Sequence, residues 1–123
     1  MTEIELTESM LIVHMKGVHK ILTLKSQLEI PLTHVVGAEI DPAVVEQWGK
    51  VKGVRIGAGL PGEILAGRVL LDGQWAFWDV HDQHKAITIK LADENFTKLV
   101  LEVTDPVADV ARIEEAVRSS KSS

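Results

Sequence analysis

Alternation of apolar and polar positions dominates the second half of the chain and predicts strands. Isoleucine or leucine occupies every second position of Lys85–Leu91, and Phe96–Val103 repeats this pattern with leucine and valine. Glu63–Leu71 and Gln74–Val80 are two further apolar runs of strand length, separated by short breaks. A period of two with one polar face predicts an antiparallel sheet that is wetted on one side.

Shorter apolar runs in the first half predict more extended segments. The polar stretch Thr7-Glu8-Ser9 suits a tight connection between Ile4–Leu6 and Met10–Met15. Leu28–Pro31 and Val35–Ile40 are also expected to be extended, and the proline places the first of them at an edge or a bend.

Helical spacing predicts short helices over Val18–Lys25 and Pro42–Trp48 and a longer one that begins at Asp105-Pro106. An aspartate followed by proline suits a helix start. The carboxylate accepts a hydrogen bond from a backbone amide of the first turn, and proline has no N–H to leave unpaired there. The apolar side of the last helix is expected to carry Val107, Val110, Ile113 and Val117. Short antiparallel strands followed by an amphipathic helix predict a small barrel or sandwich closed by that helix.

The Asp72-Gly73 pair predicts a two-residue hairpin turn, and such a turn fixes which residues of its two strands face each other. Counting outward from it places Gly67 opposite Trp78, where the missing side chain leaves room for the indole. The uncharged face is the expected core face and comprises Leu65, Gly67, Val69, Leu71, Ala76, Trp78 and Val80.

The other face of this hairpin carries charges and is therefore expected to meet solvent. It nevertheless holds neighbouring apolar and aromatic side chains, and a contiguous patch of that kind requires an explanation. The N-terminal segment or the Val18–Lys25 helix could cover it, a subunit or partner protein could bind it, or it could form a ligand groove. The candidate interaction surface comprises Arg68, Leu70, Trp75, Phe77 and Asp79.

Composition narrows the possible functions. The chain has 123 residues, no cysteine and a formal net charge of −5, which excludes a disulfide framework and disfavours nucleic-acid binding. The acidic N-terminus does not resemble a signal peptide, and Met10–Met15 is too short to span a membrane. We therefore expect a cytoplasmic protein of one domain, residues 1–118, with a polar tail over 119–123 that frays.

The sequence supports neither a nucleotide-binding motif nor a catalytic nucleophile. Gly57–Gly62 matches the G-x-G-x-x-G string, but Pro61 stands inside it and a strand rather than a helix follows. There is no cysteine and no G-x-S-x-G motif to supply a nucleophile. The sequence therefore predicts a protein that is not an enzyme and carries no cofactor.

A metal site is the alternative chemical hypothesis. Asp79, His81 and His84 could supply carboxylate and imidazole ligands to zinc or another divalent ion. The competing interpretation is a polar loop ahead of the next strand. The other histidines, at positions 14, 19 and 34, are dispersed and have no carboxylate partner nearby in the sequence.

The order of strands and turns from Gly53 to Asp105 resembles that of bacterial pleckstrin-homology-like (PH-like) domains of uncharacterised proteins. The residues that carry the resemblance are Ile30–Val35, Leu60-Pro61-Gly62, Ala66-Gly67, Phe77–Val80, Lys85–Ile87 and Leu99–Val103 running into Asp105-Pro106. The resemblance implies a mainly β, α+β fold: a PH-like split barrel of about seven antiparallel strands capped by the C-terminal helix.

Pleckstrin-homology domains bind phosphoinositides through a basic first hairpin, whereas the first connection here contains Glu8 and no basic residue. Phosphoinositide binding is therefore not carried over. The expected function is a non-enzymatic binding or assembly module that uses a sheet face or edge to bind a partner protein or itself as a homo-oligomer. The alternative is a small-ligand or metal-binding protein that uses Asp79, His81 and His84.

Overall fold

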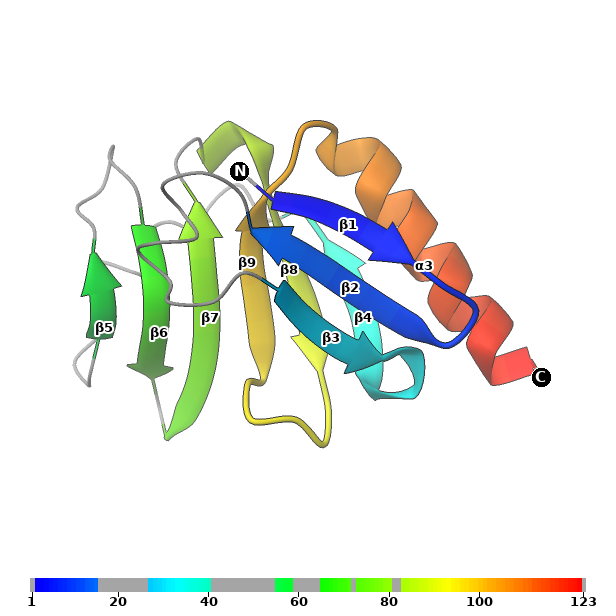
Figure 1. The fold of residues 1–123 in the computed structure, drawn as a ribbon, viewed down its shortest axis with the longest axis horizontal. Helices are drawn as coiled ribbons and strands as arrows, with labels where there is room; N and C mark the ends of the chain where they lie inside the picture. Colours follow the sequence, from blue (N-terminus) through cyan, green and yellow to red (C-terminus); the bar gives the residue numbers. More distant parts are fainter. Residues whose placement is uncertain are drawn as a thin grey trace.

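The structure is a computed structural model that describes residues 2–15, 27–40, 55–58, 65–71, 73–80 and 83–122. Within them, an antiparallel three-stranded sheet faces a six-stranded sheet, and one long helix lies beside both (Figure 1). The smaller sheet contains β1 (Thr2–Leu6), β2 (Met10–Met15) and β3 (Gln27–Pro31), in that order. The larger sheet, in the order β4-β8-β9-β7-β6-β5, contains β4 (Val35–Glu39), β5 (Arg55–Ala58), β6 (Leu65–Leu71), β7 (Gln74–Val80), β8 (Ala86–Leu91) and β9 (Lys98–Glu102).

The apolar runs predicted as strands are strands in the structure, within a few residues at their ends. No strand was predicted over Arg55–Ala58, which forms β5 and overlaps the start of the Gly57–Gly62 string. Two short 3-10 helices, η1 (Leu32–His34) and η2 (Gln83–Lys85), precede β4 and β8. The helices expected over Val18–Lys25 and Pro42–Trp48 lie outside the described residues.

The expectation of one antiparallel split barrel is wrong in two respects. The strands belong to two separate sheets that are not closed into a barrel. In the larger sheet, β9 lies between β8 and β7, and it pairs antiparallel with β8 but parallel with β7. The fold is therefore mainly β with a mixed sheet and a C-terminal helix.

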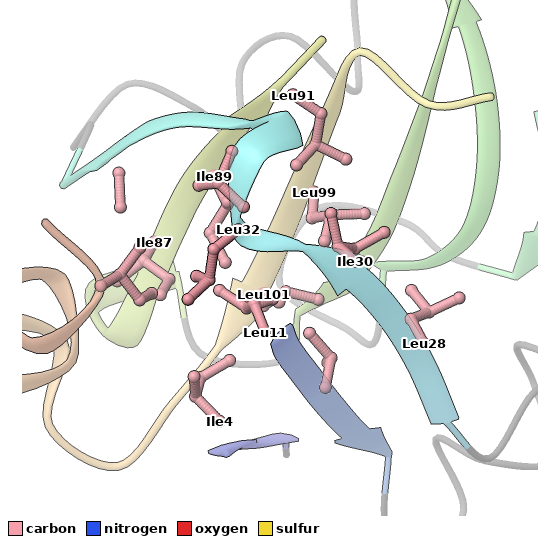
Figure 2. Close-up of a cluster of buried hydrophobic side chains, with 14 of the residues drawn as sticks. Ile4, Leu11, Leu28, Ile30, Leu32, Ile87, Ile89, Leu91, Leu99 and Leu101 are labelled. Carbon is pink, nitrogen blue, oxygen red and sulfur yellow. The ribbon is translucent and has the colours of Figure 1, made fainter. Parts of the chain in front are cut away.

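The main core fills the space between the two sheets. Side chains from the smaller sheet, such as Leu11 and Ile30, face Ile89, Leu99 and Leu101 of the larger sheet (Figure 2). All five are at most 4% exposed. Burial of this kind stabilises the folded chain by roughly 1.5–3 kcal/mol for each large aliphatic side chain.

Helix α3 (Pro106–Ser122) closes one side of this core. Asp105 accepts a hydrogen bond from the Ala108 amide, as the predicted helix start requires. Of the expected apolar side, Ile113 and Val117 are buried, but Val107 is 71% exposed because it precedes the part of the helix that reaches the core. The helix includes residues 119–122 of the predicted polar tail. Among the described residues, none of the helices has the length and apolar character needed to cross a membrane.

Candidate binding surface

The predicted hairpin register is confirmed along its whole length. Leu71 faces Gln74, Gly67 faces Trp78 and Leu65 faces Val80, as the two-residue turn requires. Gly73 has a φ of 76°, the left-handed conformation that glycine adopts without strain. The side chains of β7 can therefore be assigned to the two faces of the larger sheet with the register found here.

The face that was expected to meet solvent is covered over much of its length. Phe77 and Asp79 are both 0% exposed, so the prediction that they belong to an accessible surface is wrong for this chain. Phe77 is a member of the main core cluster, together with residues of the three-stranded sheet such as Ile4 and Leu28. The N-terminal strands therefore cover this part of the hairpin, which was the first of the three alternatives.

The opposite face of β7 is buried as well. Ala76, Trp78 and Val80 are each at most 4% exposed, as the core-face prediction required. β8 and β9 continue this pattern, because Thr88 and Glu102 on that face are also buried. The central strands are therefore buried on both faces, and the prediction of a sheet wetted on one side is wrong for them.

The rest of the candidate surface lies beside a hollow of about 370 Å³ that is lined by Arg68, Trp75, Asn95 and Phe96. We call it the Trp75 hollow. Arg68 and Asn95 are exposed, whereas Trp75 and Phe96 are half-buried. Leu70, which faces Trp75 across the hairpin, is half-buried too. The structure thus brings two of the five predicted residues into one site and adds two from the connection between β8 and β9.

Hydrogen bonds fix that connection against β7. The backbone amide of Thr97 donates to the Trp75 carbonyl at 2.8 Å, and the Thr97 hydroxyl donates to the same oxygen at 3.2 Å. Phe96 packs edge-on against Phe77, with ring centroids 5.6 Å apart and an interplanar angle of 63°. One wall of the hollow is therefore anchored to the main core through Phe77.

A histidine–carboxylate pair holds the other end of the same connection. The Nδ1 atom of His34 lies 2.5 Å from Oε2 of Glu94, and the Ala92 amide donates to the His34 carbonyl at 2.8 Å. Asp93, between these two contacts, has a φ of 59°, which directs the chain through a tight turn. Glu94 is thus turned towards η1, while the next two residues line the hollow.

The described lining residues of the Trp75 hollow combine one cationic, one amide and two aromatic side chains. Arg68 supplies the one charged side chain among its described lining residues. Within the described part of the chain, the guanidinium of Arg68 makes no hydrogen bond or ion pair. Asn95 adds an amide that both donates and accepts, and the two aromatic side chains supply apolar walls. This combination suits an anionic group attached to an apolar body.

The alternative metal site is not assembled by the described residues. Asp79 is buried within the sheet, His84 is exposed, and His81 lies outside the described residues. No group of three or more histidine, aspartate or glutamate side chains in the described ranges is arranged to hold a metal ion.

Sequence reasoning missed Asn95, Phe96 and the pairing of His34 with Glu94. The two partners of that pair are 60 positions apart, so proximity in the sequence could not reveal them. His14, also thought to lack a partner, lies 2.8 Å from Glu5 across two strands. Phe96 had one usable signal, since it begins the predicted strand Phe96–Val103 but does not fit the alternation of Leu99, Leu101 and Val103.

Comparison of the chain with protein-family models, with curated proteins and with solved structures finds no match. The resemblance to PH-like domains therefore stays a prediction, and the function is inferred from the geometry of this chain.

Proposed function

We propose that this chain is a non-enzymatic binding module that recognises an exposed segment of a partner protein through the Trp75 hollow. The observation that carries the proposal is the composition of the hollow, in which tryptophan, phenylalanine and arginine side chains meet at one accessible depression. These residue types are enriched at protein interfaces, and tryptophan and arginine dominate their binding energies.

Position in the fold supports the same proposal. Trp75 lies at the start of β7 and is half-buried, whereas Phe77, two residues further along the same face, is fully buried under the N-terminal sheet. The hollow therefore lies next to buried core side chains, which favours a preformed site. Such preorganisation lowers the entropic cost of binding.

Charge favours a partner segment over a second copy of the chain as the occupant of the hollow. The protein carries a formal net charge of −5, so two copies repel each other at long range, while the hollow itself contributes a positive side chain. A segment that is apolar with a local negative charge complements the hollow without bringing a second strongly acidic body close to the first.

The proposal is tested by selection from random peptide libraries that are displayed either through their N-termini or through their C-termini. We expect enriched peptides whose affinity for the protein falls about 30-fold or more in Trp75→Ala, the loss typical of a central interface tryptophan. Val36→Ala is the control, because Val36 is 54% exposed on β4 at the far edge of the larger sheet, and it should leave the affinity unchanged. The proposal would be overturned if the selected peptides bound the Trp75→Ala variant as tightly as they bind the parent protein.

Sedimentation of the same two proteins tests the competing occupant. We expect both to sediment as monomers at the concentrations used for binding. A parent protein that dimerises, beside a monomeric Trp75→Ala that still unfolds cooperatively, would show instead that the hollow binds a second copy of this chain.

A further inference from the structure

We infer that the Trp75 hollow binds the C-terminal carboxylate of a polypeptide whose last residue has an aromatic or other large apolar side chain. This inference rests on the proposed function and adds the chemical class of the ligand. It follows from the donors that line the hollow, from the positions of the nearby acidic groups and from the short separation of charge and apolar surface.

The polar lining is matched to a carboxylate. An arginine guanidinium has N–H donors and no acceptor, and its planar fork fits the two oxygens of a carboxylate. The exposed Arg68 is therefore suited to an anion. The amide of Asn95 offers a donor and an acceptor, which matches the C=O and N–H of the peptide group that precedes a terminal residue.

Among the described residues, Glu94 and Asp79 are acidic residues close in sequence to the lining residues, and neither lines the hollow. Glu94 is adjacent in sequence to Asn95, but its Oε2 lies 2.5 Å from the His34 ring. Asp79, on the same face of the hairpin as Arg68, is fully buried. None of the described lining residues is acidic, so an external carboxylate meets no like charge from the described walls.

The size of the hollow favours a chain terminus over an acidic side chain. Its volume of about 370 Å³ lies at the small end of ligand sites, and Arg68, Trp75 and Phe96 share it. In a terminal residue the carboxylate and the side chain are attached to the same Cα atom, so charge and apolar surface lie together. An aspartate or glutamate side chain carries only methylene groups next to its carboxylate and leaves the aromatic walls without a partner.

The experiment compares four small probes by NMR, followed through the indole N–H signals of the three tryptophans. N-acetylphenylalanine carries the terminal carboxylate and the aromatic side chain, and N-acetylphenylalaninamide lacks only the charge. N-acetylglutamic acid α-amide carries the charge on a side chain. The fourth probe, 3-phenylpropionate, keeps the carboxylate and the ring but lacks the peptide group. Trp75→Phe assigns the signal of the hollow.

We expect N-acetylphenylalanine to shift the Trp75 signal at millimolar concentration and to bind about tenfold or more tightly than the other three probes. Arg68→Gln should reduce its affinity to that of the amide. Arg118→Gln is the matched control, because it removes the same charge from an exposed site on α3 where arginine pairs with Glu115. This control should leave the affinity unchanged.

Three results would overturn the inference, and they are distinguishable from failure of the proposed function. Equal binding of the acid and the amide, unaffected by Arg68→Gln, would show an apolar site with no preference for a carboxylate. Equal or tighter binding of 3-phenylpropionate would identify a site for small carboxylic acids, and tighter binding of the glutamate probe would identify an internal acidic segment. Peptides selected through the hollow would uphold the proposed function in each case, whereas silence of the Trp75 signal with every probe and every selected peptide would end both.

Discussion

The Glu114 carboxylate of α3 accepts a hydrogen bond from the backbone amide of Ala38, with 3.0 Å between Oε1 and the amide nitrogen. Ala38 lies in β4, one of the two edge strands of the six-stranded sheet. Two residues earlier on the helix, Arg112 donates to the carbonyl of Ile4 in β1, the edge strand of the other sheet, at 3.2 Å. Helix α3 therefore joins the two sheets by occupying backbone groups that edge strands otherwise leave unpaired.

Glu114→Ala removes the acceptor of the Ala38 amide. Because that amide is part-buried, we expect the free energy of unfolding to fall by about 1–3 kcal/mol. Urea denaturation measures the change. Glu115→Ala is the control, since Glu115 is exposed and pairs only with Arg118 among the described residues, so its loss should cost about 0.5 kcal/mol or less.

Gly37→Ala tests the same contact from the strand. A Cβ atom at Gly37 would lie 3.3 Å from Oε1 of Glu114, and that carboxylate cannot retreat without losing its bond to Ala38. We expect a loss of about 1 kcal/mol in the parent protein. In the Glu114→Ala background the same substitution should be neutral or stabilise by about 0.5 kcal/mol, because alanine restricts the unfolded chain. Additive effects in this double-mutant cycle would contradict the prediction.

Two substitutions by alanine on α3, at Ile113 and at Val107, should differ sharply in their effect on the free energy of unfolding. Ile113 is 0% exposed and belongs to the main core, so Ile113→Ala should cost about 2–5 kcal/mol. Val107 is 71% exposed, and Val107→Ala should change the stability by about 0.5 kcal/mol or less. Thermal or chemical denaturation of both variants checks whether α3 is seated as described.

A second pair of substitutions tests the corrected assignment of the hairpin face. Phe77→Ala should cost about 3–5 kcal/mol, because Phe77 is fully buried and packs against Phe96. Trp75→Ala, from the same face of the same strand, should cost only about 1 kcal/mol because its side chain is half-buried. Comparable losses from the two variants would place Trp75 in the core and remove the basis for a binding hollow.

The pair formed by His34 and Glu94 should influence binding at the Trp75 hollow without contacting the ligand. His34→Ala releases the Glu94 carboxylate next to Asn95, where it competes with a bound carboxylate for Arg68. We expect the affinity for N-acetylphenylalanine to fall about threefold to tenfold. Adding Glu94→Gln to His34→Ala removes the competing charge and should restore most of the affinity. Continued weak binding in the double variant would show instead that the loss comes from displacement of the connection between β8 and β9.

The hairpin register could be predicted from the sequence because a two-residue turn determines it locally. The identity of the solvent face could not. Arg68 and Asp79 share one face, and the presence of charges there indicated solvent, yet Asp79 is 0% exposed. Alternation reports which residues lie together on a face, but only tertiary packing decides which face is covered, and here Phe77 and Trp78 are both buried.

The parallel pairing of β7 with β9 could not be predicted from the sequence either. Each strand was found by its own pattern, and the short connection from β8 to β9 correctly implies an antiparallel neighbour. Nothing local indicates that β9 also adjoins β7, since that contact joins segments with another strand between them in the sequence. The same limitation hid half of the candidate site, because Asn95 and Phe96 reach Trp75 only through this pairing.

The central position of β9 also sets the order in which the chain can be completed during synthesis. β9 is the last strand of the described chain, and it alone joins the β4–β8 pair to the β5–β6–β7 group. Until about residue 102 has left the ribosome, these two groups share no ladder of hydrogen bonds, and the apolar edges of β7 and β8 stay open. Because synthesis proceeds at about 5–20 residues per second, the time between the emergence of β7 and that of β9 lasts for seconds. Nascent chains of this protein are therefore open to aggregation or chaperone binding at these edges until β9 emerges.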